Sequence, residues 1–150
     1  MDFELSVRTA IVASGIFLWL GMLAGVWKYL QIRSSKYARA HYYVDITHRA
    51  SLMYASACLI LAVLAYFSGW SATTNFVLIL GNLIFFAGAI ISYIIHGILQ
   101  DTSNQLQQPH QMGQMTLPAV LIHGFMWALI VAELGCTTLL LIGAIKTLLF

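Results

Sequence analysis

Four long apolar runs dominate the pattern of hydrophobic and polar positions along this chain, at about residues 5–30, 40–67, 76–99 and 117–149. Each run offers the roughly 20 residues that a helix needs to cross a bilayer. None shows the strict alternation of a strand, and the backbone of a helix satisfies its own hydrogen bonds in lipid. The pattern therefore predicts an all-α integral membrane protein, a four-helix antiparallel bundle in which residues 1–150 form a single transmembrane domain.

The composition supports this interpretation. Hydrophobic residues make up 61% of the chain and charged residues 8%, whereas a soluble domain carries about 25% charged residues. Membrane lipid is therefore the expected surrounding of the chain. The net charge of +2 gives no reason to expect a nucleic-acid partner. Cys58 and Cys136 lie within apolar runs, and we expect them to be buried free thiols.

The charges also predict an orientation. Asp2 and Glu4 stand where a cleaved signal peptide carries positive charge, so we expect the first run to be a retained helix. Arg33, Lys36 and Arg39 lie between the first two runs, and positive loops face the cytoplasm. An antiparallel order then puts the polar segment 100–116 on the cytoplasmic side and both termini outside. We expect a bacterial inner-membrane location.

Small residues and size together indicate self-association. Gly21 and Gly25 form a G-x-x-x-G pattern that allows close helix packing in lipid. A 16.6 kDa four-helix unit has little interior. We therefore expect a homo-oligomer.

Histidines give the chain its candidate chemistry, because the antiparallel order places all five at one end of the bundle: His41, His48, His96, His110 and His123. A histidine within a membrane is a functional candidate, and imidazole is the commonest metal ligand. His41, Asp45 and His48 share one helical face, with Arg49 at its edge. Asp45 is placed to orient one of the two rings. A charged patch at the lipid headgroups is the alternative.

The third run carries a second polar face. Asn82, Tyr93 and His96 share this face, and the last two lie at the cytoplasmic end. Tyr93 is alternatively an interfacial aromatic residue, and Asn82 an interhelical hydrogen-bonding residue. Glu133 lies near the middle of the fourth run, where a carboxyl group has to be protonated or paired. Both a structural pairing and a proton-transfer role remain open for it.

The segment 100–116 is longer than a minimal turn between antiparallel helices requires, and long loops are often lids. Pro109, His110 and Gly113 would allow it to fold back over the mouth of the bundle. A solvated linker is the alternative.

Ala38, Arg39, Ala40 and His41 form an A-R-A-H segment at the start of the second run. This segment, with the chain length and the helix count, resembles the small four-helix membrane isomerases of the styrene oxide isomerase and hydroxylaminobenzene mutase group. The resemblance implies a homotrimer in which His41 is the axial ligand of haem b near the cytoplasmic side. Ferric iron would act there as a Lewis acid on an epoxide oxygen. That group has asparagine and glycine where this chain has Thr47 and His48, which leaves His48 open as the ligand.

We therefore expect a haem-b-dependent membrane isomerase whose small apolar epoxide or hydroxylamino substrate enters from lipid. The expected metal ligand is His41. The other expected cofactor-binding residues are His48, Arg49 and His96, and the catalytic candidates are Tyr93, Asn82 and Asp45.

Three alternatives remain. One is a single-haem b-type cytochrome with two histidine ligands, such as His48 and His96. Another is a trimeric membrane enzyme similar to the glutathione transferases, which carry an R-A-H-x-N-x-x-E-N pattern. This chain keeps Arg39 to His41 of that pattern but lacks its three later polar residues. The third is a structural or binding membrane protein without haem.

Overall fold

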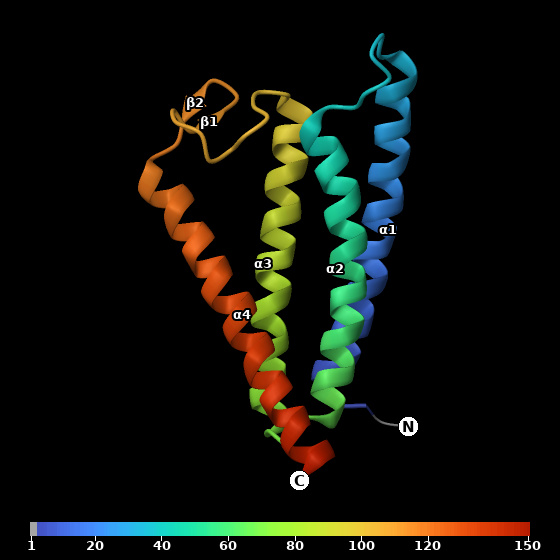
Figure 1. Ribbon diagram of the computed structural model, residues 1–150, viewed down its shortest axis with the longest axis vertical. Helices are drawn as coiled ribbons and strands as arrows, with labels where there is room; N and C mark the ends of the chain where they lie inside the picture. Colours follow the sequence, from blue (N-terminus) through green and yellow to red (C-terminus); the bar gives the residue numbers. More distant parts are fainter. Residues whose placement is uncertain (1–2) are drawn as a thin grey trace.

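A computed structural model describes residues 3–150 and contains four helices and one small hairpin. The elements are α1 (Leu5–Ser34), α2 (Tyr42–Phe67), α3 (Ala72–Leu99), β1 (Gln111–Met112), β2 (Met115–Thr116) and α4 (Ala119–Leu149). The helices run alternately up and down, so residues 35–41 and 100–118 lie at one end of the molecule (Figure 1). We call this the loop end. The predicted all-α four-helix bundle is confirmed.

All four helices are long and apolar enough to cross a membrane. Their outward faces carry large apolar side chains that are more than half exposed, among them Ile16, Val63, Ile84 and Val131. Contiguous apolar surface of this extent suits hydrocarbon rather than water. The chain is accordingly an integral membrane protein.

The helix ends differ from the predicted ones because capping groups, not hydropathy, decide where a helix stops. α1 continues to Ser34, and α2 begins at Tyr42 with His41 as its N-cap. α3 starts four residues before the predicted Phe76, because the Ser71 hydroxyl accepts a hydrogen bond of 3.2 Å from the Thr74 N–H. Polar residues thus extend the helices beyond their apolar runs.

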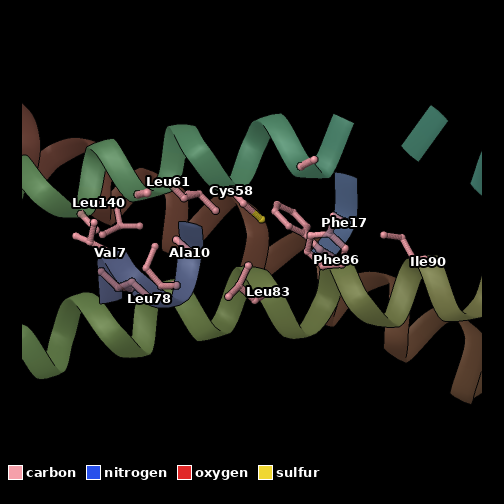
Figure 2. Close-up of a cluster of buried hydrophobic side chains, with 14 residues drawn as sticks. Val7, Ala10, Phe17, Cys58, Leu61, Leu78, Leu83, Phe86, Ile90 and Leu140 are labelled. Carbon is pink, nitrogen blue, oxygen red and sulfur yellow. The ribbon is translucent and has the colours of Figure 1, made fainter. Parts of the chain in front are cut away.

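The hydrophobic core draws side chains from all four helices (Figure 2). Val7 and Phe17 of α1 meet Cys58 and Leu61 of α2 within this cluster. Cys58 is fully buried and free, as predicted. The core binds α1, α2 and α3 into one unit.

Close contact between α1 and α2 uses the G-x-x-x-G pattern within one chain. A Cβ at Gly21 would come within 2.7 Å of the Leu52 side chain, and one at Gly25 within 3.0 Å of the His48 ring. The His48 Nδ1–H donates a 2.8 Å hydrogen bond to the Gly21 carbonyl. The two glycines therefore make room for α2 and for the imidazole that it carries.

α4 is the least integrated helix. Its buried residues are Leu140, Gly143 and Ala144, all near its C-terminal end. The Trp70 Nε1–H donates to the Leu139 carbonyl at 2.8 Å in the same region. Toward the loop end α4 diverges from α3, and residues 100–118 bridge the gap (Figure 1). This divergence creates the space in which the candidate site lies.

Candidate functional site at the loop end

Residues 100–118 fold back over the loop end. The Gln105 N–H donates to the Tyr43 hydroxyl at 2.6 Å, and the Ser92 hydroxyl donates to the Gln105 side-chain carbonyl at 2.8 Å. His110 within the segment is buried. Of the two arrangements considered from the sequence, the structure has the lid-like one and not the solvated linker.

A histidine–carboxylate pair lies beneath this segment. Gln100 adopts a left-handed conformation with φ of 50°, which turns the chain back so that Asp101 meets the last turn of α3. The His96 Nδ1–H donates to Asp101 Oδ1 at 2.8 Å, and His96 is only 6% exposed. Within residues 3–150, His96 Nε2 makes no hydrogen bond. A carboxylate on one ring nitrogen fixes the ring and leaves the other nitrogen free for a ligand or a proton.

Two tyrosines surround the pair. The ring centroid of His96 lies 5.1 Å from that of Tyr43, which stacks on Tyr93 at 6.0 Å. Tyr93 and His96 thus lie at the same level, as the helical spacing predicted. Tyr43 thus packs between Tyr93 and His96, and its hydroxyl meets Gln105 of residues 100–118.

Electrostatics link Asp101 to a second imidazole. Burial alone would raise the pKa of Asp101, but the Gly113 N–H and His96 hold the pKa of this carboxyl below its usual range. Burial lowers the pKa of His41; the charge of Asp101 opposes this shift and His96 adds to it. His41 is therefore a neutral imidazole at pH 7, the form that binds metals.

An apolar pocket of about 220 Å³ opens beside His96, between α3 and α4. Its polar side chains are Ser92, His96 and Gln105, and its walls include Ile91, Leu121 and Phe125. Ile91 and Leu121 are 56% and 57% exposed. The pocket therefore opens onto the outer, lipid-facing surface of the bundle.

A larger and more open space of about 710 Å³ lies beside His41. Polar residues line it, among them Gln31, Arg39 and Gln100. The His41 N–H donates to the Gln31 side chain at 2.8 Å, and His41 Nδ1 accepts the Tyr43 N–H at 3.4 Å. The ring thus caps α2 at the rim of this space.

The polar residues at the start of α2 are arranged differently from what their spacing predicted. Asp45 was expected to orient an imidazole, but one of its oxygens pairs with Lys28 of α1 and the other with Arg49 at 2.8 Å. Arg49 is engaged in that ion pair, and His48 faces α1 through the Gly21 carbonyl. Ion pairing outweighs an imidazole hydrogen bond here because two cations are within reach of one carboxylate.

Asn82 forms an interhelical hydrogen bond, which was the alternative to a catalytic role. It is fully buried, its amide donates to the Leu78 carbonyl at 3.0 Å, and it accepts the Thr137 hydroxyl at 3.0 Å. The 14 residues between Asn82 and His96 correspond to roughly 21 Å along a helix. Asn82 therefore joins α3 to α4 far from the His96 pocket.

Glu133 keeps one carboxyl oxygen, Oε1, buried and without a hydrogen-bond partner in the described chain. The Thr137 hydroxyl, four residues further along α4, bonds Asn82.

The histidines gather at the loop end, but in separate places rather than around one point. His41 and His96 flank Tyr43, His48 faces α1, and the rings of His110 and His123 meet each other at 5.4 Å. Among residues 3–150, no group of three or more histidine, cysteine or acidic side chains is arranged to hold a metal ion. The sequence reasoning missed Asp101 as the partner of His96, although its position directly after the helix was a usable signal.

The sequence matches no protein-family model, no curated protein and no solved structure.

Proposed function

We propose that this chain is a haem-b-dependent membrane isomerase for a small apolar epoxide or hydroxylamino compound that enters from lipid. The observation that carries the proposal is the buried His96–Asp101 pair, which borders an apolar pocket open between α3 and α4. The A-R-A-H resemblance supplies the expected cofactor and reaction class. An apolar pocket with few convergent polar groups is the usual form of a small-molecule site.

The pocket favours a small substrate. Its volume of about 220 Å³ lies below the roughly 300–1,000 Å³ of sites for drug-sized ligands. The half-exposed Ile91 and Leu121 at its mouth would let an apolar molecule pass from the acyl chains without crossing water. Ser92, Gln105 and His96 are the side chains that would orient an oxygen or nitrogen atom of the substrate.

Haem b fits the larger space beside His41 and not the His96 pocket, which is too small for a porphyrin. The larger space has the volume of a drug-sized site, a neutral imidazole in His41 and a guanidinium in Arg39 that would pair with propionate groups. Coordination through His41 Nε2 would move the ring proton to Nδ1, so the contact from the Tyr43 N–H would be released. The polar, open walls favour completion by a second copy, in line with the expected homotrimer.

When bound beside His41, ferric haem would supply a Lewis acid that polarises the C–O or N–O bond. This requires the polar end of the substrate to reach from the His96 pocket past Tyr43, whose ring centroid lies 5.1 Å from that of His96 and 6.3 Å from that of His41. The net reaction for an epoxide is redox-neutral: one C–O bond breaks, a hydrogen moves to the adjacent carbon, and a carbonyl forms. His96 would hold and return a proton at Nε2, while Asp101 fixes the orientation of its ring. Tyr93 and Tyr43 line a different space from the His96 pocket, so Tyr93 would act through the packing of Tyr43 against His96. Residues 100–118 would exclude water.

Absorption spectra of the detergent-purified protein, before and after dithionite, test the cofactor. We expect a Soret band in the wild type and its loss in His41→Ala. His96→Ala should keep the band but lose turnover of an aryl epoxide to the aldehyde. His48→Gln, which changes an imidazole facing α1, is the matched control and should keep both.

Three outcomes would contradict the proposal. A colourless wild-type protein of normal oligomer size would remove haem from it. A six-coordinate low-spin spectrum that added ligands do not change would favour the b-type cytochrome instead. Full turnover in His96→Ala would remove the proton-transfer role of the His96–Asp101 pair.

A further inference from the structure

We propose that His110 and His123 bind a divalent transition-metal ion of the Zn²⁺ class, which fastens residues 100–118 to the start of α4. This site uses neither His41 nor His96 as a ligand and does not depend on the isomerase proposal.

His110, within residues 100–118, has a buried ring nitrogen that is available to a metal ion. It is 3% exposed, and its Nδ1 lies 3.3 Å from the Gln105 carbonyl. Since a carbonyl only accepts, Nδ1 is the nitrogen that donates here, which leaves Nε2 as the nitrogen available to a metal ion. His110 Nε2 is buried and has no hydrogen-bond partner within residues 3–150. A buried acceptor left unpaired costs about 1–3 kcal/mol, so an occupant of this position would be stabilising.

His123 on α4 supplies a second imidazole at a suitable separation. The two ring centroids lie 5.4 Å apart with an interplanar angle of 83°. Zn–N bonds of about 2.0–2.1 Å at a tetrahedral angle place two ligating rings roughly 5 Å apart, centroid to centroid. In the part of the chain that the structure describes, the nitrogens of His123 form no hydrogen bond. Both rings are thus free to share one ion.

The backbone around His110 is held in place before any ion binds. The Leu117 N–H donates to the His110 carbonyl at 2.7 Å. The adjoining hairpin pairs Gln111 with Thr116 and Met112 with Met115. This pairing brings the chain directly from His110 to the start of α4, and a preorganised pair of ligands loses less entropy on binding.

The donor set defines the class of ion. Imidazole nitrogens suit Zn²⁺, Cu²⁺ and Ni²⁺, whereas Mg²⁺ and Ca²⁺ prefer oxygen ligands. No third histidine, cysteine or acidic side chain of the described residues joins the pair. Two protein ligands leave coordination positions for water or a small ligand, so the ion would be exchangeable rather than permanently bound.

Calorimetric titration of chelator-treated, detergent-purified protein with Zn²⁺ tests the site. We expect one Zn²⁺ per chain in the wild type. Loss of an outer-shell partner costs about 10–100-fold in metal affinity, so loss of a ligand in His123→Ala should cost at least about tenfold. His41→Ala, which removes a partly exposed imidazole at the same end, is the control and should leave the affinity unchanged.

A second readout separates ligation from folding. Zn²⁺ should slow hydrogen exchange of residues 100–118 in the wild type and in His41→Ala, but not in His123→Ala. His110→Asn preserves a polar group toward Gln105 and should behave like His123→Ala. Unchanged Zn²⁺ affinity in His123→Ala, whose side chain is exposed, would overturn the proposal. No wild-type binding tighter than about 1 mM would overturn it as well.

Discussion

At the scale of single residues, the loop end is organised by hydrogen bonds that reach back over short stretches of sequence. Asp101 accepts from His96 five residues before it and from the Gly113 N–H twelve residues after it. One carboxylate thus ties the end of α3 to the hairpin. Its two oxygens satisfy two donors at once, which an amide oxygen cannot do equally well.

Asp101→Asn should loosen residues 100–118 at neutral pH. Asparagine has a single side-chain oxygen for the two donors, so one of them would be left unpaired or would face an NH₂ group. We expect faster proteolysis within residues 100–118 and faster exchange of the Gly113 amide than in the wild type. Equal protection in both proteins would show that the carboxylate does not hold the segment.

The pH dependence of this segment follows from the lowered pKa of Asp101. A carboxyl with a depressed folded-state pKa contributes stability above its ordinary value of about 3.9, and the contribution is lost as pH falls through the lower folded value. Exchange of the Gly113 amide in the wild type should therefore accelerate, beyond the intrinsic pH effect, only below about pH 4. In Asp101→Asn the exchange rate of the Gly113 amide should show no such acceleration at acidic pH. If both proteins show it, a group other than Asp101 is responsible.

The sequence predicted His96 and Tyr93 at the site but not their partners. Helical spacing places His96 and Tyr93 on one face, whereas the contact with Asp101 depends on the left-handed turn at Gln100. The sequence did not identify the partners of Asp45 and Asn82, because spacing along one helix does not reveal which groups a neighbouring helix offers. Lys28 and Thr137 are those groups here.

At the scale of secondary-structure elements, the helix pairs use different means of contact. α1 and α2 approach closely over Gly21 and Gly25, while α3 and α4 are joined by the Asn82–Thr137 hydrogen bond. Hydropathy located all four helices because a span must be apolar. It did not give their ends, since caps such as Ser71 are polar and lie outside the apolar run.

Gly21→Ala should destabilise the α1–α2 contact. The new Cβ would meet Leu52 at 2.7 Å and its backbone nitrogen at 3.2 Å, so the helices would have to shift. Overpacking of this kind costs about 1–3 kcal/mol. Gly15→Ala is the matched control, because a Cβ there meets no atom of the described chain within 4 Å. In a titration with denaturing detergent, Gly21→Ala should unfold at a lower detergent concentration than both the control and the wild type.

The Asn82–Thr137 hydrogen bond should give a measurable coupling energy. Interhelical hydrogen bonds in membrane proteins average about 0.6 kcal/mol in double-mutant cycles, with a maximum near 1.7. We expect a value in this range from Asn82→Ala, Thr137→Ala and the double variant. Additive effects would show that the two side chains do not interact in the membrane.

At the scale of the whole molecule, the antiparallel order gathers the polar segments at one end, and this the sequence could predict. The divergence of α4 could not be predicted in the same way. An apolar side chain that faces lipid and one that faces another helix look alike in hydropathy, so the short buried stretch of α4 became visible only in three dimensions.

Membrane topology can be checked with single cysteines in a background without Cys58 and Cys136. Ser34→Cys and Ser103→Cys lie at the loop end, and Ser71→Cys lies at the opposite end. An impermeant thiol reagent should label the first two from one face of the membrane and the third from the other. Labelling of Ser34→Cys and Ser103→Cys from different faces would contradict the antiparallel order.

Because α4 diverges from α3, the apparent affinity of a compound for the α3–α4 pocket should depend on how much lipid or detergent is present. The mouth of the pocket is bordered by the exposed Ile91 and Leu121, so its occupancy follows the mole fraction of a compound dissolved among the acyl chains rather than its aqueous concentration. Adding empty micelles or vesicles at a fixed total amount of compound dilutes that reservoir. The apparent half-saturation value should then rise in proportion to the amphiphile added, even though the protein itself is unchanged.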